Sequence, residues 1–339
     1  MNLIVTGGCG FIGANFIHYW LEKHAEDLIV NVDACTYAAV KASLDDLEAQ
    51  PDKYKFEKAD IADYDAIDAI VKKYAIDIIV NFAAESHNSN SILNPTSFYR
   101  TNVLGAQNLM EVTRNNPGVK RLHHISTCEV FGDMALDSET AFTEESPLGG
   151  NSPYSSSKAG SNLAANAYFK TFGIPITVSV CSNNYGPYQF PEKLIPLFVT
   201  NLIQNRQITL YRESDHKREW LHVRDHCRAI ELILENGEMG NVYNIGSGVE
   251  KSVEDIAQVI LDYFGKSDAD KIYVPSRPSH DRRYLLDSAK IRSALGWAPE
   301  VAFDDGIRST IEWYIQHEQW WKPLLTKRIS TEQNWQVRK

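Results

Sequence analysis

A glycine-rich turn near the start of the chain limits the possible folds more than any other feature. Gly7, Gly10 and Gly13 follow the apolar run Leu3–Val5 and open a helical pattern over Phe11–Glu22. Glycine permits a tight turn and a close approach of a pyrophosphate to the backbone, and the start of a helix offers free N–H groups. A strand, this turn and a helix in succession predict a nucleotide-binding βαβ unit.

An acidic residue follows the next apolar run at a spacing that suits a dinucleotide. Asp33 ends the predicted strand Leu28–Val32 and stands 20 residues after Gly13. A carboxylate at this place accepts hydrogen bonds from the adenosine ribose and repels a 2′-phosphate. The segment therefore predicts NAD as the cofactor and disfavours NADP. The alternative interpretation is that Asp33 only caps the start of a loop.

The first half of the chain alternates short apolar runs with helical patterns. The further predicted strands are Tyr54–Phe56, Ile76–Val80, Leu122–Ile125 and Ile176–Val180. The further predicted helices are Tyr64–Lys73, Ser97–Arg114 and Tyr154–Thr171. Such alternation is typical of a parallel sheet that is covered on both faces. We predict an α/β fold with a Rossmann-type doubly wound parallel sheet and a smaller C-terminal substrate-binding lobe.

The second half of the chain is less regular and predicts that smaller lobe. Its expected strands and helices are Ile208–Tyr211, Val242–Ile245, Ser252–Phe264 and Asp304–Gln316. Ser252 and Asp255 form a plausible capping box at a helix start. We expect residues 1–181 to form the NAD-binding domain, with residues 220–246 returning to it, and residues 182–219 and 247–339 to form the substrate-binding lobe.

Composition disfavours several classes of partner. The 339 residues carry a formal net charge of −10 and no basic run, which argues against nucleic acid. No stretch of about 18 apolar residues is present, so no membrane span is expected. The chain begins directly as a strand, without the pattern of a signal peptide, which predicts a cytoplasmic protein. The five cysteines are scattered, which predicts reduced thiols and neither a disulfide framework nor a metal site.

Tyr154 and Lys158 indicate the chemistry. If their segment opens a helix, the two side chains lie one turn apart on the same face. An ammonium beside a phenol favours the phenolate and lowers its pKa from about 10. Such a phenol can take a proton from a sugar hydroxyl near neutral pH. Taken alone, the pair fits an exposed Tyr and Lys better, and its weight comes from the glycine turn in the same half of the chain.

With both motifs in view, the chain resembles the extended short-chain dehydrogenases that act on nucleotide sugars, and specifically the dTDP-glucose 4,6-dehydratase family. The segments that carry the likeness are Thr6–Gly13, Ala83–His87, Ile125–Gly132, Tyr154–Lys158, Cys181–Pro196 and His280–Tyr284. The likeness runs over nearly the whole chain, and the Cys181–Pro196 match is the most specific part of it.

This resemblance implies a hydro-lyase that acts on a nucleotide-diphospho-hexose, with dTDP or UDP as the nucleotide. The sugar is oxidised at C4 with NAD, water leaves across C5 and C6, and hydride returns to C6. The product is a 4-keto-6-deoxy sugar nucleotide. By the likeness Tyr154 is the base at C4, and Lys158 holds both the phenol and the nicotinamide ribose. Thr127 hydrogen-bonds the sugar O4, and Glu129 removes the C5 proton.

The resemblance also implies two sets of binding residues. The cofactor-binding set is Gly7, Gly10, Phe11, Ile12, Gly13, Asp33, Asp60, Ile61, Ala83, Ala84, Ser86, Thr101, Tyr154, Lys158, Cys181 and Asn184. The substrate-binding set is Ser86, His87, Thr127, Glu129, Asn183, Lys193, Leu194, Pro196, Tyr211, Arg218, Asn244, His280 and Arg283. Arg218 and Arg283 are expected to hold the diphosphate, because a guanidinium pairs two phosphate oxygens at once. Tyr211 is expected to stack on the base, with Asn244 beside it.

Two positions depart from the family pattern. The family has Asp before the glutamate, as the acid toward the departing C6 hydroxyl, whereas this chain has Cys128. A thiol is protonated at neutral pH and can in principle donate, although it is a weak donor. The alternative is that Cys128 only packs and that Glu129 or water protonates the leaving group. After His87 the family's Val-Asp-Arg-Ser is replaced by Asn88-Ser-Asn-Ser91, which admits a hexose other than glucose.

These departures keep other functions open. Cys128 is compatible with an epimerase, a decarboxylase or a variant dehydratase on an unusual sugar, and a non-catalytic sugar-nucleotide-binding protein is the remaining class. Glu129 argues against simple 4-epimerisation, which needs no base at C5. The resemblance further implies a homodimer through the helices at 97–114 and 154–171, unless their apolar stripes only face the sheet.

Overall fold

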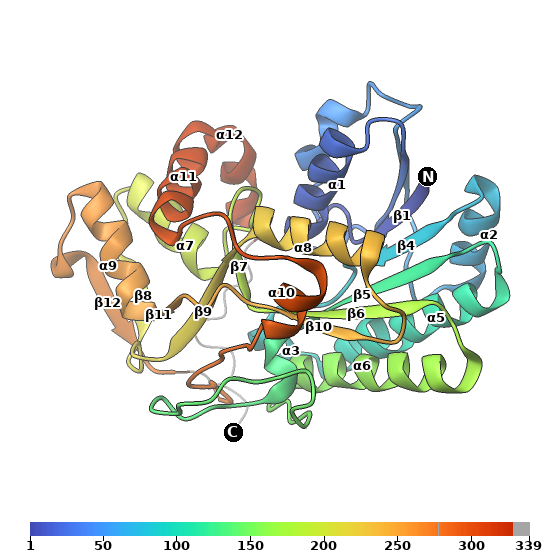
Figure 1. Ribbon diagram of the computed structural model, residues 1–339. Coiled ribbons are helices and arrows are strands. Elements are labelled where there is room, and N and C mark those ends of the chain that lie inside the picture. Colours follow the sequence, from blue (N-terminus) through green and yellow to red (C-terminus); the bar gives the residue numbers. More distant parts are fainter. Residues whose placement is uncertain (277, 328–339) are drawn as a thin grey trace.

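A sheet of seven parallel strands forms the centre of the protein. Figure 1 shows the computed structural model, with helices packed around this sheet. The order of the strands is β10-β6-β5-β4-β1-β2-β3, so the predicted doubly wound α/β fold is confirmed. The strands are β1 (Asn2–Thr6), β2 (Leu28–Val32), β3 (Tyr54–Glu57), β4 (Ile78–Asn81), β5 (Arg121–Thr127), β6 (Ile176–Cys181) and β10 (Val242–Ile245). The structure describes residues 1–276 and 278–327. The end of the predicted C-terminal lobe, residues 328–339, lies outside the described residues.

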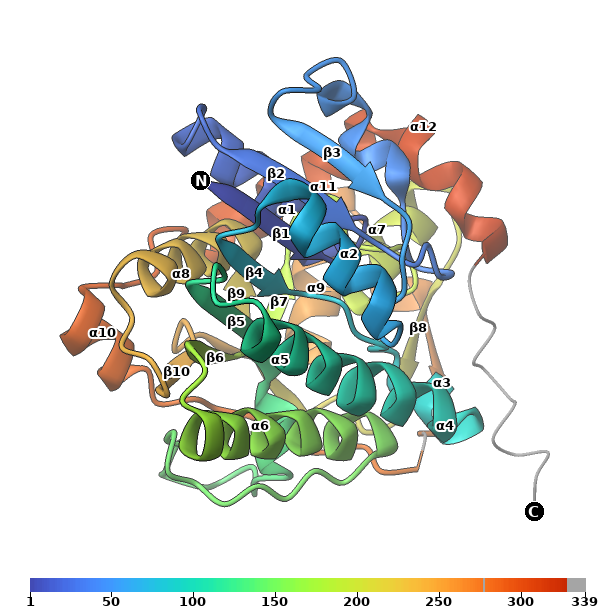
Figure 2. The ribbon, with the colours of Figure 1, turned by 90° about the vertical axis from the view of Figure 1, so that its right-hand side faces the viewer.

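Helices cover both faces of this sheet, and the alternation of side chains along each strand explains why. In β1, Leu3 and Val5 pack against Trp20 on one face, whereas Ile4 packs against Leu109 on the other. The first face is covered by α1 (Phe11–Lys23) and α8 (Val223–Asn236), and the second by α2 (Tyr64–Tyr74), α5 (Ala106–Asn115) and α6 (Pro153–Phe172). Figure 2 shows α5 and α6 side by side.

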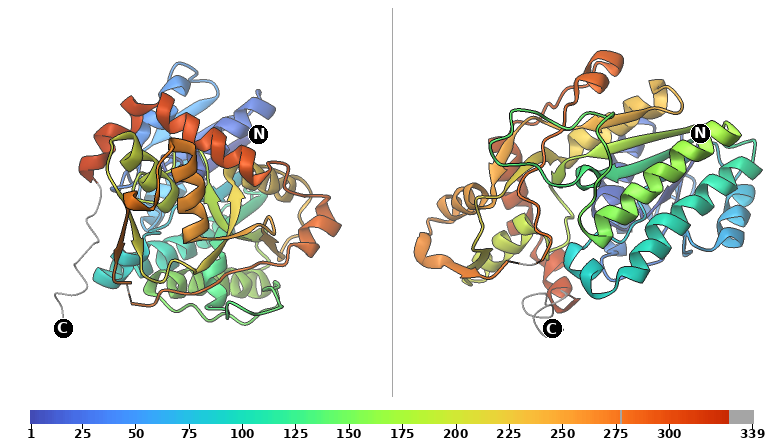
Figure 3. Two further views of the ribbon diagram at one scale, coloured as in Figure 1. Left: turned by 90° about the vertical axis from the view of Figure 1, so that its left-hand side faces the viewer. Right: turned by 90° about the horizontal axis from the view of Figure 1, so that it is seen from below.

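The C-terminal part of the chain builds a second core. The left-hand panel of Figure 3 shows the helices and strands of this part facing the viewer. Phe198, Ile260 and Ile311 are completely or almost completely buried in this core. Its strands are β7 (Asn183–Tyr185), β8 (Ile208–Tyr211), β9 (Lys217–His222), β11 (Glu250–Ser252) and β12 (Lys271–Val274), in sheets ordered β11-β9-β7 and β12-β8. Its helices are α7 (Leu194–Ile203), α9 (Val253–Phe264), α11 (Phe303–Gln316) and α12 (Glu318–Trp321).

The chain returns to the large sheet after β9. Trp220 belongs to β9 of the small sheet, whereas α8 packs on the large sheet and Val242–Ile245 pairs with β6 as its edge strand. The division into two lobes at the residues given above stays a prediction. The capping box at the start of α9 is confirmed, because the Ser252 and Asp255 side chains bond each other's backbone N–H groups at 3.0 and 2.8 Å.

The predicted helix Ser97–Arg114 is interrupted. It consists of α4 (Pro95–Phe98), a π-helical stretch over Tyr99–Gly105, and α5. Within the π-helical stretch the Asn102 amide pairs with the backbone of Glu85 at 2.9 Å in both directions, which favours the wider turn at this point. The helices that were not predicted include α3 (Asn88–Leu93), α8, α10 (Ala289–Leu295) and α12.

None of the helices in the described residues combines the length and the apolar character that are needed to cross a membrane.

Candidate active site

A cavity of about 550 Å³ lies at the carboxyl ends of the large sheet's strands. The loops that follow β1, β2, β4, β5 and β6 line it, and the strand order reverses between β1 and β4. Open α/β sheets bind their ligands at such a switch point. The predicted residues that line the cavity are Gly7, Gly10, Phe11, Ile12, Gly13, Asp33, Asp60, Ile61, Ala83, Ala84, Ser86, Thr101, Thr127, Glu129, Tyr154, Lys158, Cys181, Asn183, Asn184 and Lys193.

The glycine turn leaves bare backbone at one end of this cavity. Gly7 has a φ of +68°, and a Cβ atom on it would lie 2.7 Å from the backbone of Ala83. A Cβ atom on Gly13 would lie 2.5 Å from the carbonyl oxygen of Gly7. Side chains are therefore sterically excluded at both positions, and the first turn of α1 faces the cavity with its N–H groups accessible.

The Asp33 carboxylate is held at the end of β2 by two backbone donors. The N–H groups of Cys9 and Cys35 donate to its two oxygens at 3.0 and 2.7 Å. Burial raises the pKa of Asp33, and these two hydrogen bonds oppose that rise. The carboxylate oxygens keep lone pairs for the hydroxyls of a ribose. The bare glycine backbone and this oriented acceptor fit an NAD molecule.

Tyr154 and Lys158 lie in the first turns of α6, whose start is fixed by a capping box of Ser152 and Ser155. Both side chains are buried, and the Lys158 ammonium donates to the carbonyl oxygen of Ile125 at 2.7 Å. Burial lowers the pKa of Lys158 to about 8. The prediction that the two residues lie together at the site agrees with the cavity that they line.

The phenol of Tyr154 does not behave as the sequence analysis expects. Burial raises its pKa well above 10, and the negative charge of Glu129 adds to the rise, whereas a hydrogen bond with Thr127 opposes it. The expected net lowering by Lys158 is therefore wrong for these side chains. The physical reason is that desolvation of the phenolate outweighs the other contributions to its pKa.

Cys128 and Glu129 are neighbours in sequence but lie in different surroundings. They open a short 3₁₀ helix, Cys128–Phe131, directly after β5. Glu129 lines the cavity. Cys128 is 2% exposed and belongs to a closed apolar cluster with Val180 and Tyr284, and among the described residues it is absent from the cavity lining. Burial raises the pKa of its thiol far above the ordinary value.

Two amides near the site were not predicted as site residues. Asn88 donates to the Glu129 carboxylate at 2.9 Å, and Asn102 donates to the Ser157 hydroxyl at 2.9 Å. The departure from the family pattern after His87 could have identified Asn88 as a site residue. Asn102 shows no sequence signal beyond being a polar residue in an apolar helical pattern.

The structure spreads the predicted substrate-binding residues over several elements. Lys193 lies at the cavity and donates to the carbonyl oxygen of Ser86 at 3.1 Å. The rings of Tyr211 and His280 meet edge to face at 5.3 Å, away from the cavity lining. Asn244 does not join Tyr211, because it is fully buried in β10 and donates to the carbonyl oxygen of Phe142 at 2.9 Å. The remaining members are His87, the N-cap of α3, and Leu194 and Pro196, which lie in the first turn of α7.

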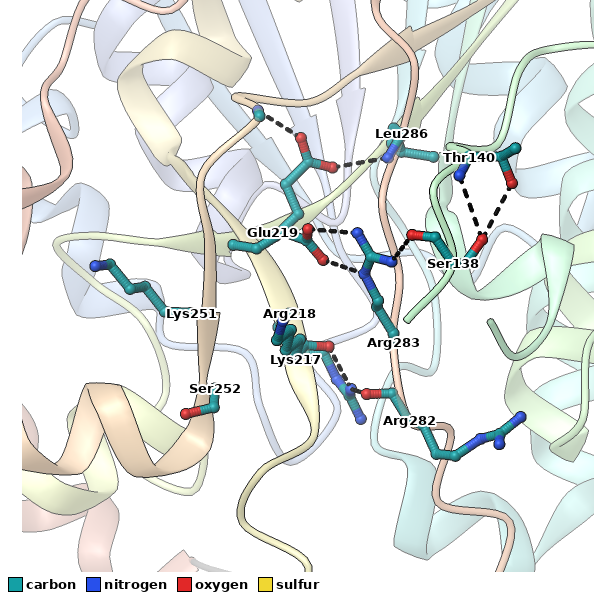
Figure 4. Close-up of polar contacts among 12 residues, drawn as sticks. Ser138, Thr140, Lys217, Arg218, Glu219, Lys251, Ser252, Arg282, Arg283 and Leu286 are labelled. Carbon is teal, nitrogen blue, oxygen red and sulfur yellow. Dashed lines mark hydrogen bonds and ion pairs between the residues drawn. The ribbon is translucent and has the colours of Figure 1, made fainter. Parts of the chain in front are cut away.

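The two arginines predicted to hold the diphosphate bind protein groups (Figure 4). Arg283 forms a two-pronged ion pair with Glu250 at 2.6 and 2.7 Å. Arg218 donates to the carbonyl oxygens of Lys217, Asp281 and Arg282 at 2.7 to 3.2 Å. Neither arginine is among the described residues that line the cavity.

Glu219 anchors the loops beside these arginines (Figure 4). It is fully buried and accepts hydrogen bonds from the backbone N–H groups of Gly248 and Leu286 at 2.7 and 3.1 Å. Burial raises the pKa of this carboxyl to about 7. The position of the arginine-bearing segment therefore depends on a buried acid.

Comparisons with known proteins agree with this geometry. The sequence model of the GDP-mannose 4,6 dehydratase family matches residues 4–310. The chain is 44% identical over 329 residues to the dTDP-glucose 4,6-dehydratase of Streptomyces niveus, which covers 96% of both chains. It superposes on the Bacillus anthracis dTDP-glucose 4,6-dehydratase, solved in complex with NAD, with a TM-score of 0.89 and 43% identity, over 96% of this chain and 99% of that one. DesIV of Streptomyces venezuelae, a dTDP-glucose 4,6-dehydratase solved with NAD bound, superposes with a TM-score of 0.91 and is 42% identical. The match covers 96% of this chain and 100% of DesIV.

Proposed function

The chain belongs to the GDP-mannose 4,6 dehydratase family, in its dTDP-glucose 4,6-dehydratase branch, and we propose from this that it is an NAD-dependent lyase that converts dTDP-glucose to the 4-keto-6-deoxy sugar nucleotide. One observation carries the proposal: Thr127, Glu129, Tyr154 and Lys158 line the cavity that begins at the glycine turn. The alternatives of an epimerase or a decarboxylase have no comparable support.

The residues divide the reaction between them. Gly7–Gly13 and Asp33 would hold NAD, which would supply the hydride acceptor for oxidation at C4 and the hydride donor for C6. Tyr154 takes the proton of the C4 hydroxyl, and Thr127 orients the oxygen at C4. Lys158 places a positive charge beside the site, where its pKa of about 8 keeps it mainly protonated at neutral pH.

Glu129 performs the elimination. It takes the proton from C5, the C5–C6 double bond forms, and the C6–O bond breaks. The same carboxyl returns the proton to the departing oxygen, which leaves as water. We assign both transfers to Glu129 because the Cys128 thiol lies in an apolar cluster outside the cavity lining, and because burial raises its pKa so far that it is a poor proton donor. After the hydride returns to C6, a solvent proton reaches C5 by way of Glu129.

A substitution at Cys128 tests this division of roles. Cys128→Ala is expected to keep kcat within about three-fold of the parent, whereas loss of a working general acid costs about 10²- to 10⁴-fold. The free energy of unfolding is expected to fall by about 1 kcal/mol, because a small cavity remains in the cluster. Steady-state turnover and urea denaturation measure the two effects. A hundred-fold fall in kcat with an unchanged free energy of unfolding would show that Cys128 is the acid that protonates the departing oxygen.

The substrate assignment is tested by incubating the purified protein with dTDP-glucose and, separately, with UDP-glucose, and by identifying the products by mass spectrometry and NMR. We expect loss of water from dTDP-glucose. A D2O incubation is expected to place deuterium at C5 of the product. Unchanged or merely epimerised sugar from both donors contradicts the proposal.

We also propose that two copies pair through α5, α6 and the π-helical stretch. Tyr99, Leu104, Leu163 and Phe172 are 44 to 59% exposed on these elements, and the right-hand panel of Figure 3 shows α5 and α6 (teal and green) side by side at the surface. The alternative, that the stripes only face the sheet, does not explain why these apolar side chains are so exposed.

The dimer is tested by Leu163→Glu. Removing this side chain from both copies and burying a charge is expected to weaken the pair by about 3 kcal/mol or more, because the contact recurs across the two-fold axis. Sedimentation velocity will then show a monomer at concentrations where the parent is a dimer. Tyr263→Glu, at a 38% exposed position on α9, is the matched control and leaves the dimer intact. A monomeric parent overturns the proposal.

A further inference from the structure

Asn88 connects the elimination residue Glu129 to the start of the helix that carries Tyr154. Its side-chain amide nitrogen donates to Glu129 Oε2 at 2.9 Å. Its side-chain oxygen accepts from the Ser152 hydroxyl, also at 2.9 Å. Ser152 is the N-cap of α6, two residues before Tyr154. Asn88 is one of the residues at which the chain departs from the expected pattern after His87.

The chemistry of the two partners fixes the orientation of the Asn88 amide. An ionised carboxylate only accepts hydrogen bonds, so the amide NH2 must face Glu129. The amide oxygen then faces Ser152, whose hydroxyl can donate to it while its lone pairs accept from the backbone N–H of Ser155 at 3.1 Å. Both ends of the amide are thus used, and rotation by a half-turn would lose the contact with Glu129, because two acceptor oxygens would then face each other.

The backbone around Asn88 also restricts its position. Asn88 is the first residue of α3, and its carbonyl oxygen accepts from the Ser91 hydroxyl at 2.7 Å. The preceding His87 caps the helix through the backbone N–H of Asn90. The amide is therefore presented to Glu129 from a short capped helix, which limits its movement.

We propose that Asn88 is a positioning residue that holds Oε2 of Glu129 and leaves Oε1 aimed at the C5 and C6 side of the sugar. This inference rests on the proposed role of Glu129. The inference connects the two departures from the family pattern, Cys128 and Asn88. Because Cys128 stands where an acidic residue is expected, Glu129 carries both proton transfers. Its carboxyl must therefore reach first C5 and then the oxygen at C6. An amide that fixes one oxygen and keeps the carboxyl plane aligned serves that double task.

The test compares Asn88→Val and Asn88→Asp in the full chain with dTDP-glucose as substrate. The valine restores the family's residue and removes both contacts. The aspartate keeps the shape and can still accept from Ser152, but it loses the donor and sets a like charge against Glu129. We expect kcat to fall about 10-fold in Asn88→Val and about 100-fold in Asn88→Asp, with KM unchanged within about two-fold.

The reaction step that is slowed in the Asn88 variants distinguishes this role from a merely structural one. Oxidation at C4 is expected to proceed at the parental rate, so the absorbance of reduced nicotinamide builds up in a single turnover, and deuterium incorporation at C5 slows. Asn241→Val is the matched control, because its amide also donates to a carboxylate, Glu238, at 3.0 Å and accepts from Lys290 at 2.8 Å, outside the cavity lining. It is expected to keep the parental kcat.

Two outcomes overturn the inference while the proposed function stands. One is parental kcat in both Asn88 variants alongside an inactive Glu129→Gln. The other is equal slowing of C4 oxidation and of elimination, which shows a general disturbance of the site. If the unsubstituted protein does not dehydrate dTDP-glucose, the proposed function itself is wrong. That result does not depend on the Asn88 variants, so the two failures can be distinguished. Should Asn88→Val not fold, the isosteric Asn88→Asp decides the question.

Discussion

Tyr154→Phe is expected to lower kcat for dTDP-glucose by about 10²- to 10⁴-fold, the range that a positioned general base contributes. The substitution removes one hydroxyl. The ring stays packed edge to face against Phe98 at 6.3 Å, so the fold and the NAD site are expected to remain intact. Turnover, NAD content of the purified protein and melting temperature measure the three consequences separately.

The Tyr154→Phe result needs a control for the loss of a phenolic hydroxyl in general. Tyr74→Phe supplies this control. Tyr74 ends α2, and its hydroxyl donates to Glu57 at 2.6 Å, outside the cavity lining. This variant is expected to keep the parental kcat. An unchanged rate in Tyr154→Phe removes the central base from the mechanism. A parallel loss of NAD or of melting temperature assigns the effect to structure instead.

The pH dependence of this step follows from the buried pair. The pKa of Tyr154 is raised by burial and by Glu129, so the free phenol is a poor base at neutral pH. A phenol of this kind becomes effective only when positive charge is brought beside it. Burial lowers the pKa of Lys158 to about 8, so the positive charge of Lys158 in the cavity is present below that pH and is lost as the pH rises further.

The cofactor side of the site was predictable from the sequence because it depends on local rules. Gly7, Gly13 and Asp33 are placed by a strand, a turn and a helix that follow one another in the chain, and the parallel sheet brings the ends of the strands to one edge. The further cofactor-binding residues that the resemblance implies also line the cavity.

The substrate side was less predictable because it depends on which segments meet in space. Arg283 pairs with Glu250, which lies 33 residues away in the sequence, and no local pattern announces that contact. Asn244 was expected to contact the substrate from the strand Val242–Ile245, but its amide is buried and donates to the carbonyl oxygen of Phe142. Desolvation is likewise a property of the whole fold, which is why the pKa of Tyr154 moved against the expectation.

The second large effect is expected from Glu129→Gln. The glutamine keeps the size of the side chain and can still bond the Asn88 amide through its oxygen, but it cannot take the C5 proton. We expect kcat for dehydration to fall by about 10³-fold or more, because one residue serves both proton transfers. Oxidation at C4 is expected to continue, so that rapid-quench analysis finds a 4-keto sugar that retains its C6 oxygen.

The retained C6 oxygen is what separates this result from a general loss of activity. Reduced nicotinamide will build up in stoichiometric amounts within a single turnover of Glu129→Gln, whereas Tyr154→Phe will show none. Glu250→Gln is not a suitable control, because Glu250 binds Arg283. Glu238→Gln is suitable, since its carboxylate bonds Asn241 away from the cavity. If Glu129→Gln still forms the dehydrated product at a rate near that of the parent, another group performs the elimination. The assignment of both proton transfers to this carboxyl is then wrong, and Asn88 loses the partner that it was proposed to position.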